Sequence, residues 1–110
     1  MAAETMPEGT ALGPIGSEIL FENDHVRVWA LHLPAGETQG WHQHDLPYIV
    51  VPVVPGDNNV MVFADGRERE TIETPGGAMW REAGAPHKLE NRGTVDYENV
   101  LIEIKTPTAG

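Results

Sequence analysis

Apolar and polar residues alternate along most of this chain, in runs that are too short for helices. Residues 22–33 are a polar turn followed by an alternating run of β-branched and aromatic residues, and residues 48–54 and 60–63 are short apolar runs. Residues 97–105 place Val100, Ile102 and Ile104 on one face and Leu101, Glu103 and Lys105 on the other. This alternation is typical of half-buried strands, and no helical period persists for three turns. The pattern therefore predicts a protein made of strands.

Glycine and proline separate these runs. The segment Ala64-Asp65-Gly66 predicts a hairpin turn, and residues 55–59 form a dense cluster of turn-forming residues. Pro52 lies inside an apolar run, where it predicts an edge strand or a bulge because proline has no N–H group to donate to a neighbouring strand. Many short strands joined by such turns predict an all-β sandwich or jelly roll.

The chain has 110 residues, which is enough for one domain with its own core. Residues 1–17 contain several glycines and prolines and few large apolar side chains, so we expect a flexible N-terminal arm followed by a single domain at 18–110. A small sandwich with a detached arm leaves strand edges that a second subunit would cover. We therefore expect a homodimer.

The charge balance excludes several kinds of partner. Seventeen acidic and seven basic residues give a formal net charge of −10, which repels nucleic acid and anionic membrane surfaces. No apolar run approaches the length of a transmembrane helix, and the N-terminus lacks the features of a signal peptide, so we expect a cytoplasmic location. The chain has no cysteine, and any metal ion must therefore be held by nitrogen and oxygen ligands.

Two glycine-containing stretches carry the candidate chemistry. The first, residues 36–44, ends in His42 and His44. Alternate side chains of a strand share a face, so both imidazoles are expected to enter the interior from one strand, where they could hold one metal ion, while Gln43 points away. The second stretch brings a third histidine, His87, directly after a glycine- and proline-rich turn.

Together these stretches resemble the paired signature of the cupin superfamily. The first motif of that family is a glycine, five residues, His-x-His, three or four residues, a glutamate, six residues and a second glycine. Here Gly36, His42 and His44 match, while Tyr48 or Ile49 stands where the glutamate belongs. The chain thus lacks the carboxylate ligand of the motif.

The second cupin motif is matched by Gly76, Gly84, His87 and Asn91, with Glu82 in place of its proline. The resemblance covers nearly the whole chain. It implies a double-stranded β-helix, the jelly-roll barrel of the cupins. In particular, the chain is similar to small single-domain cupins whose metal site consists of three histidines without the glutamate.

The resemblance implies one divalent metal ion per chain, held by His42, His44 and His87. Neutral imidazoles suit Fe(II), Zn, Ni, Cu and Mn, and a set of three imidazoles leaves positions on the ion open for a substrate. Without the carboxylate the charge of the ion is uncompensated, which favours a small anionic substrate such as an enolate.

The favoured interpretation of this site is a non-haem Fe(II) dioxygenase that cleaves or oxidises a small enolisable, β-diketone-like compound. One alternative is a Zn- or Ni-dependent isomerase, lyase or cyclase, in which the metal acts as a Lewis acid. Another is a non-enzymatic cupin that senses a metal or a small ligand. The residues by themselves do not separate these three functions.

Tyr48 and Arg81 are the candidate catalytic residues. If the strand is unbroken, Tyr48 shares the parity of His42 and His44, so its hydroxyl would reach a metal-bound ligand; a packed aromatic residue is the alternative. Arg81 would meet a substrate carboxylate or, as the excess of acidic residues favours, form a salt bridge within the protein.

Other residues near the motifs have weaker assignments. Glu90, Glu98 and Glu103 are further carboxylates that would approach the site from neighbouring strands, although exposure to solvent is the default for each. His25 and His32 lie outside both motifs and are expected to be structural or exposed. Large apolar side chains are expected to line a pocket or to pack in the core, namely Trp29, Trp41, Met61, Phe63, Met79 and Trp80.

Overall fold

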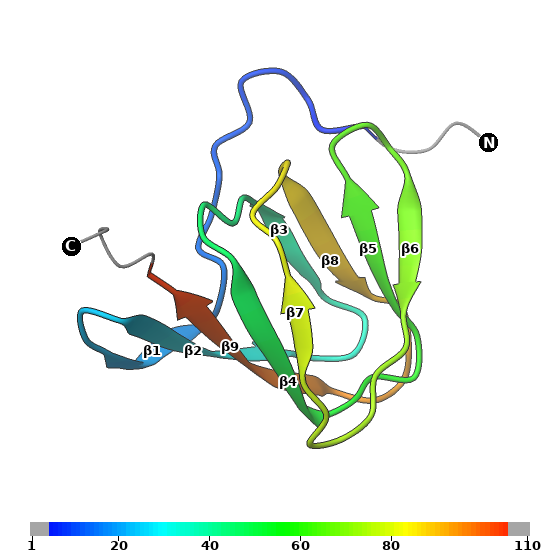
Figure 1. Ribbon diagram of the computed structural model, residues 1–110. Helices are drawn as coiled ribbons and strands as arrows, with labels where there is room; N and C mark the ends of the chain where they lie inside the picture. The colour runs from blue at the N-terminus through cyan, green and yellow to red at the C-terminus, as the bar shows by residue number, and fades with distance from the viewer. Residues whose placement is uncertain (1–4, 106–110) are drawn as a thin grey trace.

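The computed structural model describes residues 5–105, which form nine strands and no helix (Figure 1). The strands in chain order are β1 (Glu18–Glu22), β2 (Val26–Leu33), β3 (Thr38–His42), β4 (Tyr48–Val54), β5 (Asn59–Phe63), β6 (Glu68–Thr71), β7 (Met79–Arg81), β8 (His87–Asn91) and β9 (Tyr97–Ile104). Since these residues contain no helix, they also contain none that is long and apolar enough to cross a membrane.

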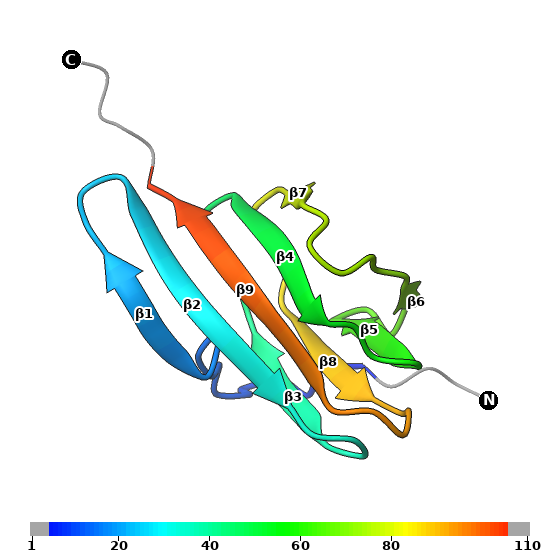
Figure 2. The same ribbon diagram turned by 90° about the horizontal axis from the view of Figure 1, so that it is seen from below.

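Within the described residues the strands form two antiparallel sheets that face each other (Figures 1 and 2). The larger sheet has the order β1-β2-β9-β4-β7, and the smaller has the order β3-β8-β5-β6. The hairpin of β1 and β2 projects beyond the smaller sheet in both views. The expected all-β jelly-roll architecture is confirmed.

The turn chemistry explains where several strands end. Asp65 and Gly66 form the tight turn between β5 and β6, and Gly66 takes a φ of 89° that favours glycine because it has no Cβ. Pro52 lies beside a register shift between β4 and β9, so the predicted bulge is present. The carbonyl of Pro52 accepts a hydrogen bond from the N–H of Gly76 at 2.9 Å, which joins β4 to the loop before β7.

The core lies between the two sheets and is made of two small groups. Leu31, Leu33, Leu89 and Tyr97 form one group, and Tyr48, Val50 and Leu101 form the other. Both groups consist of inward-facing residues, and they come from strands that are distant in the sequence but pair in the sheet, such as β2 and β4 with β9. A cavity between the groups contains the three candidate histidines.

The buried face of β9 carries polar as well as apolar residues. Tyr97, Asn99, Leu101 and Glu103 are buried, while Glu98 and three β-branched residues alternate with them and are half-buried on the outside of the sheet. Glu103 is satisfied inside because its Oε1 accepts hydrogen bonds from Trp29 Nε1 at 2.6 Å and from the Arg27 guanidinium at 2.7 Å. The alternation of residues therefore identified the strand, whereas hydrogen bonds from β2 explain how Glu103 can lie on its buried face.

The outward side of the larger sheet is apolar. We define the outer face as the outward residues of its three central strands, Val26, Val28, Ala30, Ile49, Val51, Val100, Ile102 and Ile104. None of the other described elements packs across this face (Figure 2). The exposed pair of His32 and Glu98 lies at one end of it. An uncovered apolar sheet face of this kind is typical of a contact with another protein.

Residues 5–17 contain no strand and run along the domain of their own chain. The N–H of Met6 donates to the carbonyl of Ala64 at 3.1 Å, and the N–H of Gly13 donates to the carbonyl of Trp41 at 2.8 Å. Ile15 is buried at the end of this segment. The division into an arm at 1–17 and a domain at 18–110 stays a prediction.

We expect the second subunit of the predicted homodimer to cover the outer face, because this face consists of uncharged apolar side chains in a chain with a net charge of −10. Ile102→Glu places a charge at the centre of this face and should convert the dimer to a monomer in light scattering. Ile72→Glu is the matched control, since Ile72 is 89% exposed and lies outside the face. A monomeric unmodified protein, or a dimer that survives the Ile102 change, would contradict this prediction.

Candidate metal centre

The pairing of β3 with β8 brings the first and third histidines together. His42 is the last residue of β3 and lies directly opposite His87, the first residue of β8. His44 lies two residues beyond the end of β3, so the two histidines of the first motif do not share one unbroken strand as expected. Their parity is nevertheless kept, because Gln43 between them is exposed and donates to the carbonyl of Gly84 at 3.2 Å.

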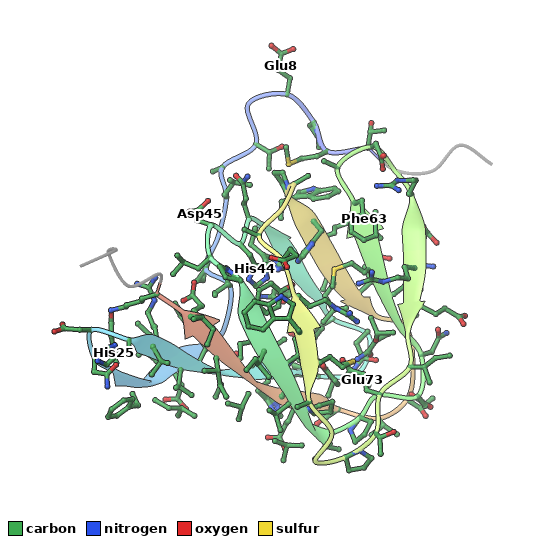
Figure 3. The ribbon with its side chains drawn as sticks, in the orientation of Figure 1. Glu8, His25, His44, Asp45, Phe63 and Glu73 are labelled. Atoms are coloured by element: carbon green, nitrogen blue, oxygen red, sulfur yellow. The ribbon has the colours of Figure 1, made fainter. Side chains whose placement is uncertain are left out.

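The three imidazoles form one compact, buried group. One ligand nitrogen from each histidine lies within 4.8 Å of the others. The ring centroids of His42 and His87 are 4.6 Å apart, and His44 is 5.2 Å from each of them. The relative exposures are 2%, 4% and 8% for His42, His44 and His87. Figure 3 shows His44 between the sheets, whereas His25 lies outside at the β1–β2 hairpin.

The ring nitrogens of this group fit a metal ion. His42 Nδ1 lies 2.8 Å from the carbonyl of Gly40, and because a carbonyl only accepts, this nitrogen carries the proton and Nε2 keeps its lone pair. His44 Nδ1 and His87 Nε2 are buried without a hydrogen-bond partner among the described residues. Buried polar atoms are nearly always partnered, so these nitrogens are consistent with a site that binds a cation.

Burial keeps the three histidines uncharged. Loss of hydration lowers the pKa of His42, and lowers the pKa values of His44 and His87 to about 3. The positive charge of neighbouring histidines adds to this effect at His44. Neutral imidazole is the form that ligates metals, so the group has the correct protonation state at neutral pH without an acidic partner.

Tyr48, the first of the two residues at the missing glutamate, faces the histidines. Its ring stacks on His44 with centroids 3.8 Å apart and planes inclined by 15°. Ile49, the second, pairs with Ile102 on the outer face. Burial raises the pKa of Tyr48, against the opposing charges of Arg81 and Arg69, so its hydroxyl remains a hydrogen-bond donor at neutral pH.

Arg81 also reaches the cavity, because it lies opposite Tyr48 in the pairing of β4 with β7. The expected salt bridge is absent: no carboxylate among residues 5–105 lies within 4.0 Å of its guanidinium. Arg69, which the sequence did not single out, enters the same cavity from β6 of the other sheet. Nothing in the sequence marked its position, because Arg69 is one of several charged residues in an alternating run.

A second residue missed from the sequence is Glu73, in the loop between β6 and β7 (Figure 3). Its Oε1 is buried without a partner among the described residues. Burial raises the pKa of Glu73, while a hydrogen bond from the Tyr97 hydroxyl and the charge of Arg81 oppose the rise. Asn99 Nδ2 in turn donates to the Tyr97 hydroxyl at 2.8 Å. Glu73 is therefore a cavity carboxyl group supported by a short hydrogen-bond chain.

The three carboxylates proposed from sequence are occupied elsewhere. Glu90 pairs with Lys88 and Arg92. Glu98 pairs with His32 at the surface. Glu103, although buried, is bound by Trp29 and Arg27, as described above. The two histidines outside the motifs are exposed, as expected.

Of the large apolar residues proposed from sequence, the methionines line the histidine cavity and the tryptophans do not. Met61 and Met79 are part of the cavity wall. Trp41 packs under Lys88, whose Nζ lies 5.2 Å from the ring centroid. Trp80 is 50% exposed on the outward side of β7. Phe63 lies at the cavity mouth, with its ring centroid 6.0 Å from that of His87.

The asparagine of the second motif has a structural role. The Nδ2 of Asn91 donates to the carbonyls of Leu33 at 3.0 Å and Val95 at 2.8 Å, and its Oδ1 accepts from the N–H of Gly93 at 3.1 Å. The backbone carbonyl of Asn91 accepts from Gly36, the first glycine of the other motif, at 2.9 Å. This buried asparagine therefore joins the segments that carry the two motifs.

Comparison with solved structures shows the same fold in cupin proteins. A cupin domain from Bordetella pertussis is 29% identical, with 88% of this chain and 98% of that chain covered and a TM-score of 0.74. A conserved Klebsiella pneumoniae protein with a double-stranded β-helix domain is 20% identical, with 96% and 86% covered and a TM-score of 0.65. A DMSP lyase from Ruegeria pomeroyi is 16% identical, with 80% and 42% covered and a TM-score of 0.57. No protein-family model and no curated protein matches the sequence.

We predict that the metal-free protein loses stability as the pH falls from about 7 to 5. The unfolded chain binds protons on His44 and His87 near their usual pKa of 6.5, while in the folded state these pKa values are about 3. The stabilisation is thus complete above pH 6.5 and is lost on acidification toward 3. Each such proton contributes a slope of about 1.4 kcal/mol per pH unit.

Urea unfolding at several pH values after chelator treatment measures this slope. His87→Gln should reduce this slope by the contribution of about one proton, which is about 1.4 kcal/mol per pH unit. The exposed His32→Gln is the control and should leave it unchanged. A free energy of unfolding that is independent of pH across this interval would contradict the prediction.

Proposed function

We propose, because the chain has the cupin fold and gathers three neutral histidines between its sheets, that it binds one divalent metal ion and acts on a small enolisable anion. The favoured activity is that of a non-haem Fe(II) dioxygenase for a β-diketone-like compound. The observation that carries this proposal is the set of buried imidazole nitrogens without hydrogen-bond partners among the described residues. His42, His44 and His87 would hold the ion.

A bound Fe(II) ion would supply the activation of dioxygen and would polarise the carbonyl oxygens of a substrate. The protein supplies orientation and a dry environment. The hydrogen bond from His42 Nδ1 to Gly40 fixes one ring, and the stacking of Tyr48 on His44 supports another. The Tyr48 hydroxyl, kept protonated by burial, would donate a hydrogen bond to a substrate oxygen.

The cavity wall favours a small ligand with an apolar carbon skeleton. Its apolar part consists of Ile15, Leu31, Val50, Met61, Met79, Leu89 and Leu101. Such a lining lowers the local dielectric constant beside the histidines, which strengthens the electrostatic contacts made there. The absence of a carboxylate at position 48 leaves the positive charge of an ion for the substrate to neutralise, and this supports an anionic ligand.

A second candidate function is a metal-assisted lyase or isomerase that uses no dioxygen. The observation that favours it is Glu73, a cavity carboxyl group with a raised pKa and one free oxygen, which is suited to move a proton at a carbon next to a carbonyl. The Ruegeria pomeroyi protein of the same fold is a lyase. Under this proposal Glu73 takes the proton from the carbon and later returns it, while Tyr97 stabilises the carboxylate.

Metal binding and oxygen uptake test the first proposal together. We expect the protein to bind about one equivalent of divalent metal, and the Fe(II) form to consume oxygen when acetylacetone is added. His42→Ala/His44→Ala should lose both the metal and the oxygen uptake. His25→Ala/His32→Ala removes the same number of imidazoles outside the site and is the matched control. A full equivalent of metal in the first double variant would contradict the assignment.

For the second candidate, we expect metal-loaded protein in heavy water to exchange the hydrogens next to the ketone of α-ketobutyrate, as followed by NMR. Glu73→Gln should slow this exchange by about 100-fold without changing the metal content, because the base is lost. The rate should rise as the pH rises through the raised pKa of Glu73. Glu98→Gln, at the surface, is the control. Exchange that is equally fast in Glu73→Gln would exclude this role.

A further inference from the structure

We propose that the ligand of this site is a small organic acid whose carboxylate is held by Arg69 and Arg81, at a distance from the atoms that meet the histidines. This inference rests on the proposed function and deepens it, because it narrows the substrate from an enolisable compound to one that carries a carboxylate. It depends on the charge balance of the chain, on the position of the two arginines, and on what surrounds them.

Arg69 and Arg81 differ from the other basic residues of the chain in their ion pairing. Of the seven basic residues, all lie within the described part of the chain. Five form ion pairs there, namely Arg27, Arg67, Lys88, Arg92 and Lys105. Arg69 and Arg81 have no ion pair among residues 5–105, although the chain carries seventeen acidic residues. Arg69 is exposed and Arg81 is half-buried, so both guanidinium groups remain open to an external carboxylate where they line the cavity.

The two arginines converge on the cavity from opposite sheets. Arg69 lies opposite Met61 in the pairing of β5 with β6, and Arg81 lies opposite Tyr48 in the pairing of β4 with β7. Both line the cavity that contains the histidines. Burial raises the pKa of Tyr48 and the charges of both arginines oppose this rise, while the charge of Arg69 adds to the burial and the His42 charge that lower the pKa of His87. An anion held by this pair would therefore lie near the candidate metal centre.

Their neighbours orient the guanidinium groups without neutralising them. Arg69 Cζ lies 5.4 Å from the ring centroid of Phe63, and Arg81 Nη2 lies 3.7 Å from Met79 Sδ. Burial raises the pKa of Glu73 and the nearby charge of Arg81 opposes this rise, but the two side chains form no ion pair. The planar donor fork of each guanidinium matches the two oxygens of a carboxylate, whereas the apolar wall beyond suits a short carbon chain.

Acetylpyruvate is a suitable probe, because it is acetylacetone with one terminal methyl group replaced by a carboxylate. Its ethyl ester keeps the diketone and removes the charge. We expect calorimetry on the metal-loaded protein to show that the acid binds about tenfold more tightly than the ester. In Arg69→Gln/Arg81→Gln this ratio should fall to about one while the metal content stays unchanged.

Arg67→Gln is the matched control for this experiment. Arg67 lies on the same side of the chain as Arg69 and at 5.3 Å from the same Phe63 ring, but it is already paired with Asp65 at 2.8 Å. It should keep the full preference for the acid. Equal binding of acid and ester by the unmodified protein, or an equal loss in Arg67→Gln and the double variant, would overturn the proposal.

The same titration on chelator-treated protein separates this inference from the proposed metal chemistry. A preference for the acid that persists without metal and disappears in Arg69→Gln/Arg81→Gln supports the carboxylate site even if the protein binds no metal. Normal metal binding together with no preference for the acid overturns the carboxylate site and leaves the metal centre intact.

Discussion

The burial of three neutral imidazoles between two sheets is the constraint on which the rest of the site depends. The pairing of β3 with β8 sets His42 opposite His87, and the next inward residue of the chain, His44, completes the group. Buried nitrogens without partners cost folding free energy. Such an arrangement is stable only because the surrounding strands fix it, and a cation that accepts the lone pairs would repay that cost by binding the folded state.

Hydrogen bonds at the edge of the sandwich keep the two motif segments in place. Asn91 bonds to the backbone of β2 and of the turn before β9, and its own carbonyl receives the N–H of Gly36. Gly36 has a φ of 82°, a conformation that residues with a Cβ rarely adopt. The motif glycine and asparagine therefore position the histidine strands without contacting a ligand.

Charge is distributed so that the cavity differs from the rest of the molecule. Most basic side chains of this acidic chain form ion pairs with carboxylates at the surface, for example Arg92 with Glu68 and Glu90. The histidine cavity instead combines neutral imidazoles with Arg69 and Arg81. With two guanidinium groups and one carboxyl group, that of Glu73, this cavity is less negative than the surface around it, which would favour the entry of small anions over large polyanions.

The sequence by itself predicted the strands and an all-β sandwich or jelly roll, because these follow from periodicity and turn chemistry, and it predicted the three histidines through the resemblance of their spacing to the cupin motifs. It placed Tyr48 toward the site only if the strand ran unbroken from His42, whereas in the structure β3 ends at His42 and Tyr48 faces the site as the first residue of β4. It did not determine which face of β9 is buried, that Arg69 and Glu73 join Arg81 in one cavity, or that Trp80 points outward. These features depend on which strands pair and in what register. The alternation of residues along a strand defines two faces but does not say which one is buried. Contacts with strands that are distant in the sequence decide that.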